Sequence, residues 1–166
     1  MVEAGDLAAL ASAAALVGGV LFAGMQVYSY ERRRREQYTM EVLRGLQAPE
    51  VMRAARLLWE VPDGMPSDKF CAQPGVEEAF LTIATLFESI GYMVHRKLIS
   101  LDVVIDTMGG VMPVHWTKGK RYVEDVRADG HPRFFEWFQW LVEEVQARSA
   151  EAPPKPAYLA HAAERR

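Results

Sequence analysis

The longest uncharged stretch of the chain lies near its N-terminus. No charged residue occurs from Leu7 to Tyr30, and Ala, Leu, Val and Gly dominate this run. A helix rises about 1.5 Å per residue, and about 20 apolar residues cross the hydrocarbon core of a bilayer. Residues 7–30 are therefore predicted to form a transmembrane helix, with residues 1–6 as a short external N-terminus.

The flanks of this stretch argue against a cleaved signal peptide and give the helix an orientation. Signal peptides begin with basic residues, whereas this chain begins with Glu3 and Asp6. Positive charge stays on the cytoplasmic side of a membrane and can contact lipid headgroups. The basic flank consists of Arg32, Arg33, Arg34 and Arg35. We expect a protein of the bacterial inner membrane, with its N-terminus outside and its C-terminal domain in the cytoplasm.

One face of the predicted transmembrane helix carries small residues. Ala11, Ala15, Gly19 and Ala23 recur every four residues. Small residues at this spacing let a second helix approach closely, since packing drives helix association in lipid. The face is interpreted either as a contact for another subunit or a second copy of the chain, or as a chance result of a high alanine content.

The region 31–148 has the periodicity of a helical domain. In the best example Phe80, Ile83, Phe87, Ile90 and Val94 alternate by three and four, which is typical of the core face of an amphipathic helix. No segment shows the alternation of a strand. The predicted fold is all-α, with the N-terminal transmembrane helix followed by a small cytoplasmic bundle of five or six helices. Residues 149–166 form a polar tail rich in Pro and Ala. The expected helices cover residues 36–46, a segment from Pro49, 76–97, a segment capped by Ser100, 113–128 and 133–148.

Few residues suggest chemistry. Asp102 and Asp106 share a helix face, but a second acidic or histidine pair is missing, so neither a metal site nor a cofactor is predicted. Glu88 lies within an apolar stretch, and burial would call for a cationic partner. The candidates for that partner are Arg96, Arg121 and Arg127. No phosphate loop or nucleophile motif occurs, so we expect a protein that is not an enzyme. A net charge of −3 argues against nucleic-acid binding.

An unusual aromatic cluster occupies the last predicted helix. The run from Phe134 to Leu141 is apolar on more than one face. Part of it is expected in the core, and exposed Trp and Phe mark interfaces. Whether the cluster is core or interface stays open at this point. The candidate interface residues are Phe134, Trp137, Phe138 and Trp140.

The whole pattern resembles a bacterial family of small, single-pass membrane-anchored helical domains of unknown function. The resemblance covers about residues 35–145. It rests on Phe87-Glu88 in an aromatic and apolar helix, on the helix start Leu98-Ile99-Ser100-Leu101-Asp102, and on the later Trp116 and Arg121. The resemblance implies a fold and a topology but no reaction.

These observations favour a non-catalytic accessory subunit of a larger bacterial membrane complex. Its transmembrane helix would pack against that complex and its domain would cover the cytoplasmic face, and respiratory and photosynthetic complexes are the candidate hosts, between which no residue selects. Its expected partners are membrane lipids, other membrane protein subunits or a second copy of the chain. The alternative is a membrane-anchored signalling or regulatory adaptor that binds a soluble cytoplasmic protein.

Overall fold

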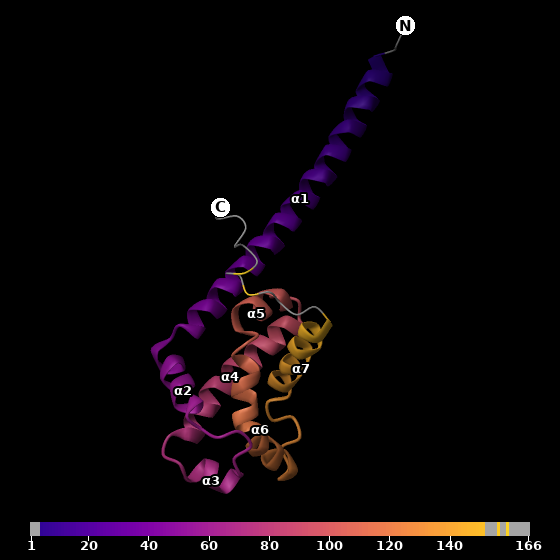
Figure 1. Ribbon diagram of the computed structural model, residues 1–166. Coiled ribbons are helices and arrows are strands. Elements are labelled where there is room, and N and C mark those ends of the chain that lie inside the picture. The colour runs from indigo at the N-terminus through magenta and orange to yellow at the C-terminus, as the bar shows by residue number, and fades with distance from the viewer. Residues whose placement is uncertain (1–3, 152–155, 157–158, 160–166) are drawn as a thin grey trace. The chain divides into compact units, whose positions relative to one another are not determined.

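The part of the chain that the computed structural model describes, residues 4–151, 156 and 159, contains seven helices and no strand (Figure 1). Side chains are described from Leu16 onward, except at Glu31. The prediction of an all-α fold is confirmed. In chain order the helices are α1 (Ala4–Leu46), α2 (Pro49–Trp59), α3 (Ser67–Ala72), α4 (Val76–His95), α5 (Leu101–Met108), α6 (Met112–Ala128) and α7 (Glu136–Glu151).

The chain divides into two units, Met1–Tyr38 and Thr39–Arg166. The first unit consists of most of α1. The last turns of α1 belong to the second unit, where Val42 is buried. Most of the predicted tail 149–166 lies outside the described residues, although α7 continues to Glu151.

The prediction of a transmembrane helix over residues 7–30 is wrong for the structure as described. Among the described residues, no helix combines the length and the apolar character needed to cross a membrane. The predicted segment lies within α1, whose backbone is described from Ala4. The helix then continues without a break through the arginines 32–35 to Leu46. The predicted inner-membrane location, which depended on that helix, is corrected with it.

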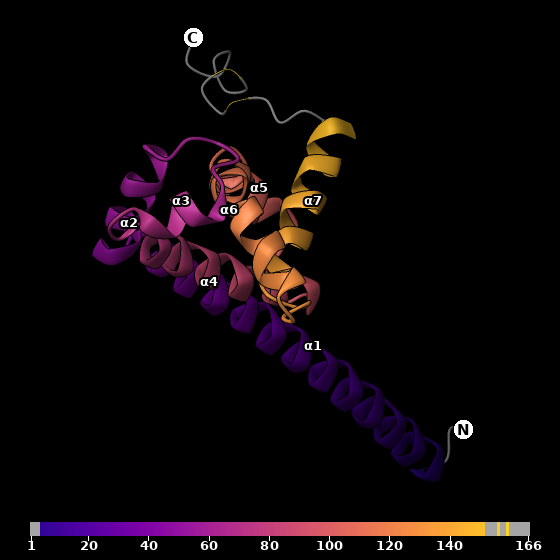
Figure 2. The ribbon, with the colours of Figure 1, turned by 90° about the horizontal axis from the view of Figure 1, so that it is seen from below.

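Helix α4 is the centre of the second unit. Figures 1 and 2 show it between α2 and α7, and these two helices make the most extensive contacts with it. The apolar stripe predicted from the sequence faces inward along its whole length, which confirms the periodicity argument. Its members are all buried, namely Phe80, Ile83, Phe87, Ile90 and Val94.

The ring of Phe80 packs at the crossing of α4 and α6. It meets Phe70 edge to face at 5.7 Å, Tyr122 at 5.9 Å and Phe135 at 6.0 Å between ring centroids. Such pairs contribute more than their buried area alone. Gly119 lies directly against the ring, and its lack of a side chain lets α6 approach α4. The phenol of Tyr122 donates a 2.7 Å hydrogen bond to Glu77, which joins the same two helices.

The connection between α2 and α4, residues 60–75, packs on the domain. It contains α3, whose Phe70 is fully buried. Asp63 pairs with the largely buried Lys118 of α6 at 2.7 Å. Ser67 forms a hydrogen bond with Asp125, also on α6. These contacts position the connection as part of the fold.

The helix starts follow local sequence rules at two of the predicted places. Pro49 occupies the first turn of α2, where its missing N–H costs nothing. Ser100 caps α5, because its hydroxyl accepts the N–H of Asp102 at 3.2 Å. The last helix, in contrast, begins at Glu136 and not at the predicted residue 133. Phe135 has a φ of 52°, a conformation that interrupts helix there.

His115 is buried between aromatic rings, which leads to a pH prediction. Its ring lies 6.4 Å from both Trp59 and Phe87, and Nδ1 is 2.9 Å from the carbonyl oxygen of Val111. Burial lowers the pKa of His115 below 6.5, although the carbonyls of Val111 and Ala55 oppose this effect. His115 therefore binds a proton more readily in the unfolded chain than in the folded chain. The free energy of unfolding decreases as the pH drops below about 6.5.

We expect the unfolding free energy to decrease below that pH by at most about 1.4 kcal/mol per pH unit. The variant His115→Phe should lose this part of the pH dependence. Urea unfolding between pH 7.5 and 5 measures it. Parallel curves for the two proteins would contradict the prediction.

Candidate functional site

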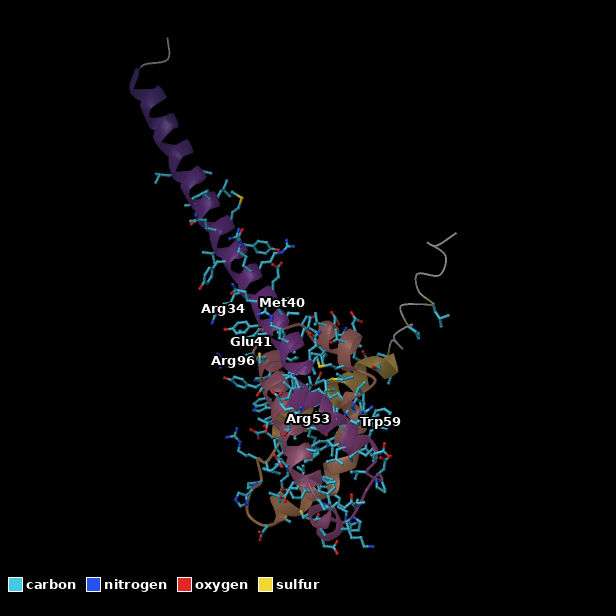
Figure 3. All side chains as sticks on the ribbon, turned by 90° about the vertical axis from the view of Figure 1, so that its left-hand side faces the viewer. Arg34, Met40, Glu41, Arg53, Trp59 and Arg96 are labelled. Atoms are coloured by element: carbon cyan, nitrogen blue, oxygen red, sulfur yellow. The ribbon has the colours of Figure 1, made fainter. Side chains whose placement is uncertain are left out.

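Four aromatic side chains from α4 and α7 meet at the surface of the second unit. We call Tyr92, His95, Trp137 and Trp140 the aromatic surface. Tyr92 and His95 are exposed, and the two tryptophans are partly exposed. His95 lies 4.5 Å from Trp137 and 5.7 Å from Trp140 between ring centroids, and Tyr92 lies 5.9 Å from Trp137. The guanidinium of Arg96, labelled in Figure 3, is 5.9 Å from the ring of Tyr92.

The aromatic surface exists because the start of α7 is held tightly against α4. Gly91 lies so close to the backbone of Trp137 that a Cβ there would be 2.8 Å from the carbonyl carbon. One turn earlier, Glu88 accepts the N–H of Phe138 at 2.7 Å. Phe87 stacks on Phe138 at 5.0 Å. The same five-residue stretch of α4, Phe87 to Gly91, thus provides space, a hydrogen bond and apolar contact for α7.

Arg127 of α6 fixes the turn that leads into α7. Its Nε donates to the carbonyl of Phe134 at 2.8 Å, and Nη2 donates to the carbonyl of Phe135 at 3.1 Å. A further hydrogen bond joins it to Gln139 in the first turn of α7. These bonds support the left-handed conformation of Phe135, which is costly for a residue with a side chain.

Glu88 has a backbone partner in place of the cationic one expected from the sequence. Its carboxylate lies at the N-terminus of α7, where unpaired N–H groups and the helix dipole favour negative charge. Burial raises the pKa of Glu88, and the N–H groups of Phe138 and Trp137 counteract that rise only in part. Of the predicted partners, Arg127 is nearby but is bonded to the carbonyls of the turn.

Removing this carboxylate should loosen α7. Glu88→Ala is expected to lower the unfolding free energy by about 1.5 kcal/mol, the lower end of the range for a charge-assisted hydrogen bond, because the site is only partly buried. Glu88→Gln keeps an acceptor oxygen and should recover about half of the loss. Urea unfolding at pH 7 measures both. Equal effects of the two substitutions would mean that the acceptor makes no contribution.

The structure divides the predicted interface cluster between core and surface. Phe138 is fully buried, and Phe134 is partly buried next to Phe135. Trp137 and Trp140 remain accessible. The helical spacing explains this division, because Phe138 points toward α4 whereas Trp137 and Trp140 lie on an adjoining face. The sequence alone did not indicate that Tyr92 and His95 would join them, because they lie on another helix.

A second candidate surface lies in the first unit. We call Leu16–Tyr30 of α1 the apolar segment. Its large apolar side chains are each 60–72% exposed, and they point to all sides of the helix. They are Leu16, Val17, Val20, Leu21, Phe22, Met25, Val27, Tyr28 and Tyr30.

The predicted small-residue face overlaps this segment only in part. Gly19 and Ala23 are exposed, and a Cβ added at Gly19 would meet nothing within 4 Å. The side chains of Ala11 and Ala15 lie outside the described residues.

The four arginines that follow the apolar segment are exposed. Arg32 pairs with Glu36 at 3.1 Å, and Arg34 donates to the hydroxyl of Tyr38. Arg33 and Arg35 belong to the same exposed turn.

Residues of the kinds used in catalysis are scattered over the described part of the chain. No group of three His, Cys, Asp or Glu side chains there could hold a metal ion. Burial, together with the nearby Glu77 and Asp68, raises the pKa of the Cys71 thiol, which is the opposite of an activated nucleophile. Asp102 and Asp106 are exposed, and Asp102 lies 3.8 Å from Arg148.

A comparison with known proteins identifies the family. The model of a domain of unknown function, DUF4760, matches residues 8–145. No curated protein and no solved structure matches the sequence. The predicted resemblance to a family of unknown function is confirmed, over a longer stretch than expected, whereas the match does not show membrane anchoring. The chain belongs to the DUF4760 family.

Proposed function

We propose that this chain is a non-catalytic accessory subunit of a larger protein complex, and that the apolar segment Leu16–Tyr30 is its main contact with that complex. The observation that carries the proposal is the exposure of nine large apolar side chains on one stretch of helix. Monomeric proteins rarely expose a continuous apolar area of this kind without a binding role. A helix that is apolar on all sides is normally buried by other parts of a protein or complex.

The expected partner is a protein that offers apolar helices on more than one side of the apolar segment. Gly18, Gly19 and Gly24 have no neighbour within 4 Å of an added Cβ, so another helix can approach the backbone closely at these positions. Burying the exposed side chains would contribute roughly 25 cal/mol per Å² of apolar surface, before the cost of association. The second unit has its own closed core and would be held at the surface of the complex.

Purification of the full chain under mild conditions, followed by light scattering and mass spectrometry, tests the proposal. We expect a particle of fixed composition that contains the 18.7 kDa chain and at least one different protein. The variant L21D/F22D places two charges in the apolar segment and should release the chain from that particle. A matched variant, S89D/D106N, changes exposed polar residues of the second unit and should leave the particle intact.

Two results would contradict the accessory role. A chain that purifies alone, or only with copies of itself, has no host complex. A chain that keeps its partner after deletion of residues 1–38 attaches through the second unit, which would favour the adaptor function.

A further inference from the structure

The aromatic surface has the chemistry of a binding site for proline-rich chain. Aromatic rings from two helices lie side by side with part of their faces accessible. Grooves lined by Trp and Tyr bind proline-rich segments in the polyproline II conformation, because proline rings pack on aromatic faces and little conformational entropy is lost. Arg96 on one side and Glu144, one turn beyond Trp140, provide polar groups at the rim.

The chain itself contains a segment that suits this surface. Pro153, Pro154, Lys155 and Pro156 follow two residues after the end of α7. Three prolines in four residues favour polyproline II. Lys155 can pair with Glu144 or lie over a tryptophan ring.

Length decides whether this segment can reach the aromatic surface of its own chain. Trp140 lies eleven residues before Glu151, which is about 16 Å along the helix, and Trp137 is about 21 Å away. Pro154 lies three residues after Glu151 and can reach at most about 11 Å back. In addition, Pro156 and Leu159 are both exposed. The chain is therefore too short to bring Pro153 and Pro154 back to the aromatic surface of the same copy.

We propose that two copies of this chain form a dimer by exchanging their proline segments, so that residues 153–156 of each copy bind the aromatic surface of the other. An antiparallel arrangement of the two α7 helices about a two-fold axis brings the end of one helix next to the start of the other. Each site then consists of Tyr92, His95, Trp137 and Trp140 from one copy and the proline segment from its partner. This dimer does not depend on the apolar segment or on the proposed accessory role.

Sedimentation velocity of the full chain over a range of concentrations tests the proposal. We expect a dimer of twice 18.7 kDa. The variant P153A/P154A/P156A should raise the dimer dissociation constant about tenfold or more. The control variant E164A/R165A changes the same tail outside the proline segment and should have no effect. L21D/F22D should also leave this dimer unchanged, which separates it from the proposed function.

A mixing experiment distinguishes exchange between copies from any contact within one copy. Tyr92→Ala removes an exposed ring from the aromatic surface, and Trp59→Ala removes an exposed ring elsewhere as a control. The Tyr92→Ala chain and the proline-substituted chain should each dimerise poorly. Mixed together, they should form a heterodimer, because one chain supplies an intact aromatic surface and the other an intact proline segment. Unfolding curves show whether each variant is folded. If Tyr92→Ala is not folded, Trp140→Phe replaces it in the mixing experiment.

The indole N–H signals of the four tryptophans give an independent measurement by ¹⁵N nuclear magnetic resonance. The signals of Trp137 and Trp140 should shift with concentration and on proline substitution, whereas those of Trp59 and Trp116 should not. A chain that stays monomeric at all concentrations overturns the proposal. A dimer insensitive to both the prolines and Tyr92, or tryptophan shifts that do not depend on concentration, overturns it as well.

Discussion

Gly91→Ala is expected to lower the unfolding free energy by about 3 kcal/mol, although alanine is the better helix former by about 1 kcal/mol. The added methyl group would overlap the carbonyl of Trp137, and it would lie 3.1 Å from the Cβ of the same residue. The carbonyl belongs to the backbone, so it cannot rotate away as the end of a long side chain can. The start of α7 must move off α4 as a whole.

That displacement would also break the neighbouring contacts between α7 and α4. The hydrogen bond from the N–H of Phe138 to Glu88 and the stacking of Phe138 on Phe87 both depend on the same approach of α7 to α4. Urea unfolding at pH 7 measures the loss, which should lower the melting temperature by about 10 °C. The tryptophan fluorescence should change in the same variant, because Trp137 and Trp140 form part of the displaced surface.

Gly45→Ala is the matched control for Gly91→Ala. Gly45 is also helical and belongs to the second unit, but an added Cβ would lie 3.5 Å from the Cδ1 of Leu86, an ordinary contact. This substitution should be neutral or stabilising by about 0.5 kcal/mol. A similar loss in both variants would show that the approach of α7 is not the cause.

Gly119→Ala is the second change with a large expected effect. The methyl group would overlap the ring of Phe80, a fully buried side chain. Rings of Phe70, Tyr122 and Phe135 surround Phe80, so it has no empty space into which it can turn. Overpacking of a dense core costs about 1–3 kcal/mol, and we expect a loss near the upper end of that range.

A compensating substitution gives the sharpest measurement at this site. In the Gly119→Ala background, Phe80→Leu makes room for the new methyl group, although by itself it should destabilise the chain. The two changes should therefore be non-additive, and the double variant should be more stable than the sum of the single effects predicts. Additive effects would mean that Gly119 and Phe80 do not compete for the same space.

The sequence by itself predicted the helices of the second unit other than α3, and the inward face of α4. The stripe on α4 is buried as predicted, since an apolar residue every three or four positions can face only one side of a helix. Pro49 and Ser100 mark helix starts through interactions within a few residues. Such local rules act before any tertiary contact, so a single sequence is enough to apply them.

Only the tertiary structure decided what those helices bring together. Glu88 has a backbone N–H as its partner because the start of α7 lies beside it, 50 residues further along the chain. The aromatic surface combines Tyr92 and His95 with two tryptophans of another helix. The transmembrane prediction over residues 7–30 is wrong, since no helix among the described residues has the length and apolar character that a membrane span requires. Composition reports what each residue prefers, whereas the close packing at Gly91 and Gly119 depends on neighbours far away in the sequence.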